Sequence, residues 1–361
     1  MSAPLTPSLV RVPRLATLVA CRALDFAADH RALELLHRVR ARLMHRTSAR
    51  QIETCIPAGL VCAGLESSIN DVVIARVGSR PELPTAIVKL ARTEAATTAL
   101  LREANAIAAL KADPRFRDFP IRLPDVLVDG ERDGRRYLVE TLLPGISAAQ
   151  LLARGESCRR IASVAVGAIG QFHLRTAGLV QVDRTMLERW INRPALAVDR
   201  VVSSTRSASL RGLVRGLSED LEGLTLAAGW VHGDFAPGNV LMDPDGRRVT
   251  GIIDWELASS SELLALDVAT FLLAANVRVA RRGLGAVIVA LLRDAGASAL
   301  RSSLEEAARQ GPGDPIPTGA LVLLCWLRHV AANLTKSDRY ARHRVWRRYN
   351  VDVVLDSLAQ R

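Results

Sequence analysis

The chain has 361 residues, 49% of them apolar and only 4% aromatic, which allows two packed lobes and excludes a globally disordered protein. The net charge of +11 comes from 48 basic and 37 acidic side chains, and such a surface attracts phosphates and nucleic acid. Because the basic residues form no motif with interleaved aromatics, we attribute the excess to composition and expect no nucleic-acid partner.

Cysteine usage and hydropathy indicate a protein of the cytoplasm. The five cysteines are odd in number and include no CxxC pair, which argues against a disulfide framework or a zinc site. The residues before Cys21 have the look of a lipoprotein cleavage box, but their apolar run begins only at Leu15 and is too short for a signal sequence. No uncharged apolar stretch reaches the ~18 residues of a membrane helix, so we expect no membrane partner.

Residues 1–50 are predicted to form an N-terminal extension. Residues 1–14 contain three prolines and no periodicity, which predicts a loose tail. From residue 15 to 46, apolar residues recur at helical spacing with arginines and histidines between them, which predicts an amphipathic helix. Such a helix can lie on a membrane surface or pack on the next domain, and packing is the commoner explanation.

Residues 51–143 show the pattern of a sheet with one helix. β-Branched and alternating runs predict two hairpins, the second turning at Asp133-Gly134. An Ala- and Leu-rich stretch from Thr93 to Lys111 predicts a helix with Thr93 as its N-cap. The predicted strands are residues 72–77, 86–90, 125–128 and 136–140.

Pro144-Gly145 breaks the chain, and residues 144–361 are predicted to be mostly helical. Helical spacing covers residues 147–153 and 157–178, whereas the polar residues 203–209 are predicted to be a linker. Strand character returns only in a hairpin over residues 239–253. The sequence thus predicts an α+β chain with a β-rich first part and a larger helical second part.

The strongest motif runs from Trp230 to Leu241 and contains Asp234 and Asn239, five residues apart. The hairpin that follows returns the chain to its starting point, so Asp254 is expected beside Asn239. Phosphoryl transfer needs such a set, because one carboxylate orients the acceptor hydroxyl while a second carboxylate and an amide oxygen hold Mg²⁺.

An ordinary surface turn explains residues 243–246, but not His232-Gly233-Asp234 and Ile253-Asp254-Trp255-Glu256 on either side. This pair of motifs resembles the aminoglycoside phosphotransferase and choline kinase superfamily, over about residues 56–267. Protein kinases place Arg between His and Asp and read Asp-Phe-Gly at the second motif. The resemblance therefore implies a small-molecule kinase with a bilobal, protein-kinase-like fold, with its N-lobe at 51–143 and its C-lobe at 144–361.

The resemblance also assigns roles to individual residues. It implies that Asp234 is the catalytic base, that Asn239 and Asp254 are the Mg²⁺ ligands, and that His232 braces the catalytic loop. A general-base role for His232 is the less favoured alternative, because Asp234 already fills it. Asp267 matches the aspartate that ties the loop backbone down, although an ordinary acid on a helix face is an equal explanation.

Lys89 is the candidate for binding the α- and β-phosphates of the nucleotide. The chain has only three lysines, and this one lies inside an apolar strand, where a charged side chain needs a partner. A lysine that protects a sheet edge is the alternative. The expected partner is Glu103 in the middle of the following helix, whereas Glu94 complements the first turn of that helix.

The phosphate loop matches protein kinases less well, because residues 64–71 contain a single glycine. The hydroxyl groups of Ser67 and Ser68 and the loop amides are candidates for phosphate binding, and a plain turn is the alternative. By the same resemblance, adenine is expected along the backbone from Glu140 to Leu142.

Together these features predict a phosphotransferase that uses ATP, or alternatively GTP, with Mg²⁺ to phosphorylate a hydroxyl of a small molecule such as a sugar, nucleoside, antibiotic or other metabolite. Arginines in residues 278–282 and 339–348 favour a neutral or anionic acceptor over a polycation, although a solvated helix face also explains them. The sequence indicates no oligomeric state.

Three other functions are compatible with parts of the sequence. A catalytically weak nucleotide-binding regulator on the same fold fits the glycine-poor loop, but the complete set of catalytic residues argues against it. A protein kinase conflicts with Gly233 and with Trp255-Glu256. A nucleic-acid binder is suggested by charge alone.

Overall fold

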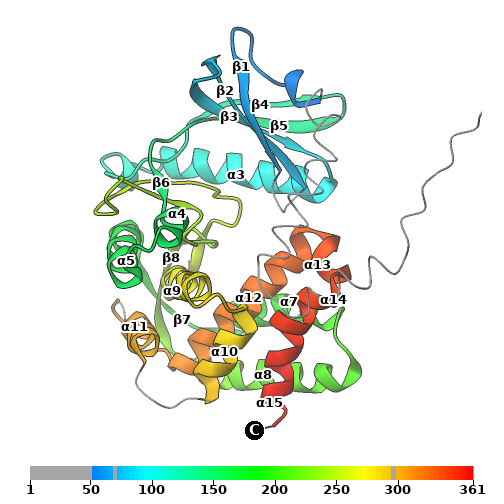
Figure 1. Ribbon diagram of the computed structural model, residues 1–361. Coiled ribbons are helices and arrows are strands. Elements are labelled where there is room, and N and C mark those ends of the chain that lie inside the picture. The colour runs from blue at the N-terminus through cyan, green and yellow to red at the C-terminus, as the bar shows by residue number, and fades with distance from the viewer. Residues whose placement is uncertain (1–50, 68–70, 294–297, 310, 361) are drawn as a thin grey trace, which may run out of the picture.

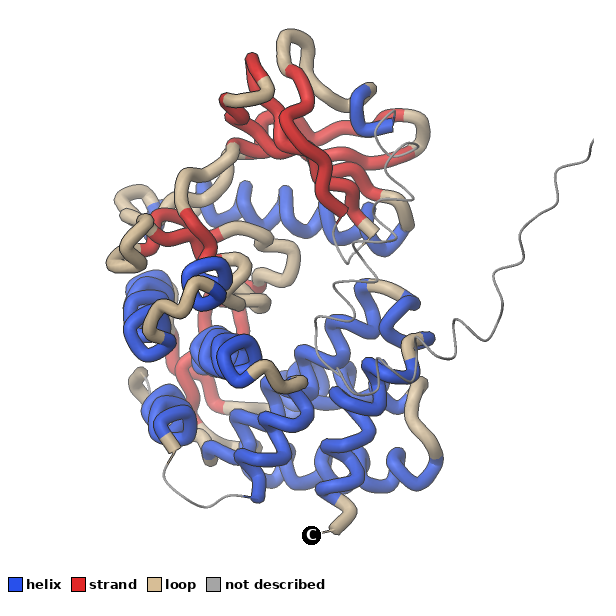
Figure 2. The backbone as a smooth tube through the Cα atoms, in the orientation of Figure 1, coloured by secondary structure: helices blue, strands red, loops and turns tan. Residues whose placement is uncertain are grey.

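The computed structural model of the protein describes residues 51–67, 71–293, 298–309 and 311–360. The predicted N-terminal tail and amphipathic helix lie outside these residues, as does Ser68. An antiparallel sheet forms one end of the molecule, and a larger, mostly helical part forms the other (Figure 1, Figure 2). This arrangement confirms the predicted α+β class, while the exact boundary between lobes at residues 143 and 144 stays a prediction.

The N-terminal sheet has the strand order β1-β2-β3-β5-β4, and every neighbouring pair is antiparallel. Both predicted hairpins are present, and Asp133 and Gly134 have the positive φ values that a tight hairpin turn requires. The sequence analysis did not predict β1. The strands are β1 (Val61–Ser67), β2 (Val72–Arg80), β3 (Leu83–Ala91), β4 (Val126–Arg132) and β5 (Arg135–Thr141).

Side chains alternate between the two faces of the sheet, and each face carries its own buried cluster. Val88 and Leu90 belong to a small core on one face. Helix α3 (Glu94–Ala112) covers the other face, and Thr93 caps its first turn as predicted. Lys89 stands between the two apolar residues of β3, so its side chain points to the side of α3.

Two small antiparallel sheets lie in the C-terminal part and carry the loops of interest. The predicted hairpin of residues 239–253 is present as β9 and β10, whereas the sequence analysis predicted neither partner of β8. One sheet consists of β6 (Ile146–Ser147), β9 (Val240–Met242) and β10 (Val249–Ile252); the other consists of β7 (Gly178–Gln181), β8 (Thr225–Val231) and β11 (Ser259–Leu263).

Helices form the remainder and enclose one large apolar core that includes the fully buried side chains of Trp190, Trp255 and Trp326. The helices are α4 (Ala148–Ala153), α5 (Cys158–Leu174), α6 (Arg184–Leu187), α7 (Arg193–Asp199), α8 (Ser204–Leu221), α9 (Ala265–Ala280), α10 (Leu284–Arg293), α11 (Ala299–Ala308), α12 (Thr318–Lys336), α13 (Asp338–Arg342), α14 (Arg344–Arg347) and α15 (Val353–Leu358).

The predicted linker over residues 203–209 is wrong, because α8 begins at Ser204. The serines and arginine of this stretch occupy the first turns of the helix. Burial of one apolar stripe outweighs the weak helix propensity of serine. That stripe consists of Leu210, Leu213, Leu217 and Leu221.

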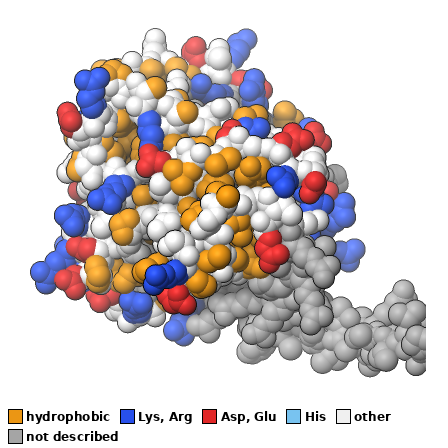
Figure 3. All heavy atoms as spheres, turned by 90° about the horizontal axis from the view of Figure 1, so that it is seen from above, with side chains coloured by type: hydrophobic (Ala, Val, Ile, Leu, Met, Phe, Trp, Pro, Cys, Tyr) orange, Lys and Arg blue, Asp and Glu red, His pale blue; other side chains and the backbone are white. Residues whose placement is uncertain are grey.

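The surface over the N-terminal sheet mixes basic, acidic and apolar side chains (Figure 3). Among the helices of the described residues, none combines the length and the hydropathy that crossing a membrane requires.

Asp71 connects the N-terminal sheet to the C-terminal helices. It follows β1 in the chain and adopts a positive φ of 58°. Its Oδ2 atom accepts a hydrogen bond from Ser337 Oγ at 3.1 Å, and its carboxylate pairs with Arg339 of α13. The start of β2 is therefore tied to the C-terminal helices.

The loop between β8 and β9 depends on a glycine. Gly233 has φ +80°, and a Cβ atom at this position would lie 2.2 Å from the main-chain oxygen of Leu257. Asp267, in the first turn of α9, accepts hydrogen bonds from the backbone N–H groups of His232 and Gly233 at 2.7 and 2.9 Å. Asp267 therefore ties the loop down, rather than lying on an exposed helix face.

Replacing Gly233 by Ala is expected to lower the free energy of unfolding by about 3 kcal/mol, because the new methyl group meets backbone and the φ angle is unfavourable. Urea denaturation measures this change. Gly238→Ala in the same loop is the matched control, since no atom lies within 4 Å of its added Cβ. Equal stability of the two variants would contradict the prediction.

Candidate active site

Lys89 is the centre of a buried cluster of charges. Its Nζ atom lies 2.7 Å from Glu103 Oε1, 3.1 Å from Glu140 Oε2 and 2.9 Å from Asp254 Oδ1. The sequence predicts the contact with Glu103, and this contact is present; that carboxylate is only 3% exposed. The ammonium group therefore joins the sheet, α3 and the C-terminal part at one point.

Three carboxylates share one ammonium group in this cluster. Burial is the largest influence on Glu103 and raises its pKa to about 8, although Lys89 opposes the change. Burial likewise raises the pKa of Glu140. At Lys89 burial acts to lower the pKa, but Asp254, Glu103 and Glu140 together hold it well above its usual value. Burial of the Glu103 and Glu140 carboxylates beside a single ammonium group is thus the cause of both raised pKa values.

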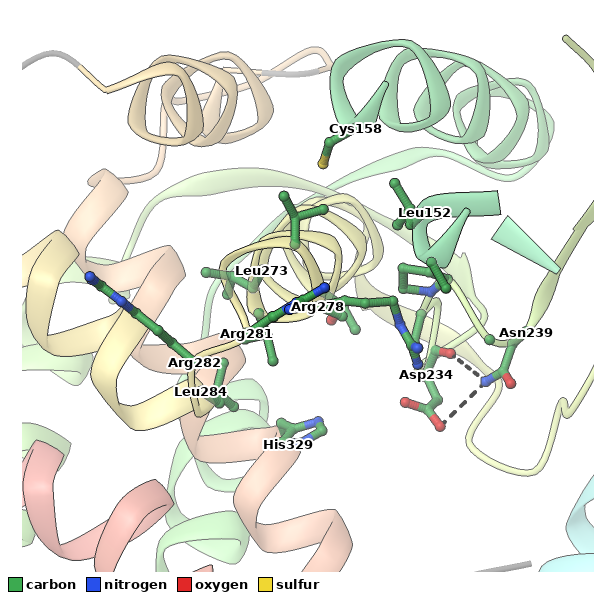
Figure 4. Close-up of a pocket in the computed structure, with 18 of the residues that line it drawn as sticks. Leu152, Cys158, Asp234, Asn239, Leu273, Arg278, Arg281, Arg282, Leu284 and His329 are labelled. Atoms are coloured by element: carbon green, nitrogen blue, oxygen red, sulfur yellow. Dashed lines mark hydrogen bonds between the residues drawn. The ribbon is translucent and has the colours of Figure 1, made fainter. Parts of the chain in front are cut away.

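Asp234 and Asn239 meet in the loop between β8 and β9 (Figure 4). Asn239 Nδ2 donates to the main-chain oxygen of Asp234 at 2.9 Å and lies 3.5 Å from its Oδ2 atom. The backbone N–H of Ile253 donates to the main-chain oxygen of Asn239 at 3.0 Å, so the next residue, Asp254, follows directly beside it. The predicted hairpin thus returns the backbone at Asp254 to Asn239, as expected.

His232 braces this loop with both ring nitrogens. Nδ1 accepts from the backbone N–H of Asp234 at 3.2 Å, and Nε2 pairs with the main-chain oxygen of Ile253 at 2.9 Å, which assigns the proton to Nε2. The ring also packs against Trp255, with the ring centroids 4.6 Å apart. Both ring nitrogens therefore brace the loop, one toward Asp234 and one toward Ile253.

Asp254 occupies a strained position. Its φ of 63° is in the left-handed region, which residues with a Cβ seldom adopt. The neighbouring Trp255 is fully buried and its Nε1 donates to the main-chain oxygen of Ile252 at 2.9 Å, which holds the turn in place. Desolvation acts to raise the pKa of Asp254, but Lys89, Lys336 and His232 together keep it below its usual value.

Lys336, at the end of α12, is a second cation of the site that the sequence analysis did not single out. Its Nζ atom lies 3.6 Å from Asp234 Oδ2 and pairs with Glu256. Burial acts to lower its pKa, but these two carboxylates more than offset it and raise the pKa above its usual value. Its rarity was a partial signal, because it is one of only three lysines in an arginine-rich chain.

The two predicted Mg²⁺ ligands present suitable oxygen atoms. Asn239 uses its amide nitrogen toward Asp234, which leaves its side-chain oxygen for a cation, and Asp254 is ionised. No three His, Cys, Asp or Glu side chains gather into a metal site among the residues that the structure describes. Mg²⁺ keeps several waters and is commonly held by one or two protein ligands together with phosphates, so this donor set suits it. The ligand roles stay predictions.

The remaining predicted nucleotide contacts are less complete. Ser67 is the last residue of β1 and pairs with Val73, whereas Ser68 lies outside the described residues. The side chain of Glu140 points to Lys89, a contact that its alternation along β5 could have predicted. The backbone N–H of Leu142 donates to Thr85 at 2.9 Å, so adenine binding here, which stays a prediction, would use carbonyl groups.

The unusual pKa of Glu103 has a consequence for stability. Its folded-state pKa of about 8 lies above the ordinary value of 4.5, so the unfolded chain loses this proton first as the pH rises. The free energy of unfolding of the native protein is therefore expected to fall, relative to that of Glu103→Gln, by on the order of 2 kcal/mol between pH 5 and pH 8.

Urea denaturation across this pH range measures the difference between the two proteins. Glu94→Gln, in the exposed first turn of the same helix, is the control and should follow the native protein at every pH. A constant difference between the native protein and Glu103→Gln from pH 5 to pH 8 would show that Glu103 is ionised throughout.

Comparisons with known proteins bear on this geometry. Residues 61–307 match the phosphotransferase enzyme family, APH. No curated protein matches the chain in sequence. The GDP complex of the wild-type aminoglycoside 2′-phosphotransferase-IIIa is 13% identical, with a TM-score of 0.52, and the match covers 88% of this chain and 98% of that one.

A thermostable mutant of aminoglycoside phosphotransferase APH(4)-Ia in its apo form is 16% identical, with a TM-score of 0.51, and the match covers 82% of this chain and 95% of that one. A ternary complex of that enzyme with ADP and hygromycin B is 15% identical, with a TM-score of 0.50, and the match covers 83% of this chain and 94% of that one. These likenesses confirm the predicted bilobal, protein-kinase-like fold. Because the family match spans more than half of its length, the chain belongs to the phosphotransferase enzyme family.

Proposed function

We propose that the protein transfers the γ-phosphoryl group of ATP or GTP to a hydroxyl group of a small molecule, with Mg²⁺ as cofactor, in the cytoplasm. The observation that carries the proposal is the 2.9 Å contact between Lys89 and Asp254, next to the paired Asp234 and Asn239. A cation for the phosphates, oxygen ligands for a metal and a carboxylate for the acceptor thus meet at one place. The solved relatives that contain GDP or ADP support both nucleotides.

Each side chain then has its own task. Asp234 accepts the proton of the acceptor hydroxyl while the new O–Pγ bond forms and the bond from Pγ to the β-phosphate oxygen breaks. Asn239 and Asp254 hold Mg²⁺, which when bound neutralises charge on the phosphates. Lys89 contacts the α- and β-phosphates, and Glu103 keeps its ammonium group in position.

The charge of the cleft supports a bound cation. Two ammonium groups there pair with five carboxylates, three around one lysine and two around the other, so acidic groups outnumber the lysines that contact them. A divalent cation brought with the nucleotide makes up this difference. The carboxylates are those of Glu103, Glu140, Asp234, Asp254 and Glu256, and the ammonium groups are those of Lys89 and Lys336.

Two cavities adjoin Asp234, of about 720 and 840 Å³, and arginines outnumber acids in the lining of each. In the larger one, the acid besides Asp234 is Glu262, which pairs with Arg328 at 3.0 Å and with Arg189 at 3.4 Å. A polycationic acceptor would meet like charge on these walls, which disfavours it. We therefore include a neutral or anionic acceptor in the proposed function.

Asp234→Asn keeps the size of the side chain and removes its basicity. We expect Mg²⁺-dependent nucleotide turnover, and mass gain across a pooled metabolite screen, to fall by about 10²- to 10⁴-fold, while nucleotide affinity changes little. Asp245→Asn, at the exposed tip of the β9–β10 turn, is the control and should keep native activity. Nucleotide binding by the native protein without any turnover would instead identify a regulator.

Asp254→Asn is expected to raise the Mg²⁺ concentration that gives half-maximal turnover by at least about tenfold, because an amide is a weaker ligand than a carboxylate for this hard cation. A Mg²⁺ titration at saturating nucleotide measures the shift, with Asp245→Asn again as the control. An unchanged Mg²⁺ requirement would remove Asp254 from the ligand set.

A further inference from the structure

The smaller of the two cavities runs along one face of helix α9, away from the reacting groups (Figure 4). The helix contributes side chains three or four residues apart, which lie on a single stripe. The catalytic loop is at the start of this stripe, because Asp267 bonds to the loop backbone and Thr270 lines the cavity together with Asp234. In chain order, the stripe consists of Thr270, Leu273, Ala274, Val277, Arg278 and Arg281.

The stripe changes character along its length. Its middle is apolar, and Leu152 and Trp326 continue this apolar lining from other helices. Its far end is basic, where Arg282 joins Arg278 and Arg281. An α-helix rises ~1.5 Å per residue, so Arg281 stands ~16 Å along the axis from Thr270. In Figure 4 the side chain of Arg278 extends back toward Asp234, whereas Arg281 and Arg282 lie farther along the helix, so a ligand with one end at Asp234 meets guanidinium groups along the far half of the cavity.

The basic end has no counter-charge. Arg278, Arg281 and Arg282 are exposed to the cavity or to solvent, and none forms a hydrogen bond or ion pair through its side chain with a residue that the structure describes. The acids of the lining are already engaged, because Glu156 pairs with Arg160 and Asp234 with Lys336.

At this end of α9, Arg281 occupies a backbone conformation that glycine adopts more easily. Arg281 ends α9 in the left-handed conformation, with φ 54° and ψ 38°. Helices commonly place glycine or asparagine at such a position, because a Cβ atom is unfavourable there. Arg281 nevertheless lines the cavity in this conformation.

We propose that the acceptor is an amphipathic hydroxylated acid. Its hydroxyl group lies at Asp234, its apolar body lies along Leu273 and Val277, and its carboxylate or phosphate binds to the arginines at the end of α9. Guanidinium groups suit both anions, because they offer paired donors in a plane. The proposal rests on the proposed function and narrows its acceptor.

Matched compounds test this proposal. We would measure binding by calorimetry, in the presence of Mg²⁺ and a non-hydrolysable ATP analogue, for ω-hydroxy carboxylates of graded length and for the corresponding neutral ω-hydroxy carboxamides. The carboxylates are expected to bind at least tenfold more tightly, with the largest preference at an intermediate length. A series in which no carboxylate binds better than its amide overturns the proposal.

A triple variant, Arg278→Gln with Arg281→Gln and Arg282→Gln, is expected to abolish this preference and to leave nucleotide affinity unchanged. Arg247→Gln, an exposed arginine on the β9–β10 turn, is the control and should keep the preference. Basic residues also stabilise helix C-termini. A triple variant that loses thermal stability but keeps the preference would show that the arginines serve the helix alone, which also overturns the proposal.

The outcome is separable from that of the proposed function. Turnover of nucleotide that depends on Asp234 and Mg²⁺ tests phosphoryl transfer without reference to the acceptor. Such turnover together with equal binding of acid and amide would sustain the kinase and reject the acidic acceptor. Absence of Asp234-dependent turnover, with carboxylates still bound more tightly than their amides, would reject the kinase and keep the acidic ligand.

Discussion

The buried ammonium group of Lys89 is the contact on which the rest of this structure depends. A charged side chain is costly inside a protein unless it is paired, and here the sheet, α3 and the C-terminal part each supply a carboxylate. The two ends of the molecule are thereby fixed around one cation. The same cation lies beside the groups that the proposed reaction uses, so one side chain both joins the two parts of the fold and belongs to the proposed site.

Around this point the backbone is held in conformations that it would not adopt alone. Asp254 has a positive φ, which a residue with a Cβ seldom adopts, and the buried Trp255 beside it holds the turn. Strain of this kind persists only where the surroundings overdetermine it. Gly233 adopts its positive φ without strain, and Asp267 fixes the loop there. The cost is met by the large apolar core, and the result is a set of oxygen atoms that are oriented before any ligand arrives.

The sequence predicted those parts of the molecule in which local pattern and chemistry agree. The hairpins, α3 with its cap, the return of the chain from Asn239 to Asp254, and the contact between Lys89 and Glu103 all follow from short motifs. Features that depend on distant packing were missed. Strand β8 reads as part of a motif, α8 begins in a serine-rich stretch, and Lys336 comes from a helix a hundred residues beyond Asp234. Local periodicity carries no information about such partners.

The pairing of Asp71 with Ser337 and Arg339 has a mechanical consequence. Together with the contact between Lys89 and Asp254, this pairing joins the sheet to the helical part at a second point. Any movement of the start of β2 away from α13 has to break it. Its helical side is the segment that directly follows Lys336, so such a movement would also be felt at the end of α12.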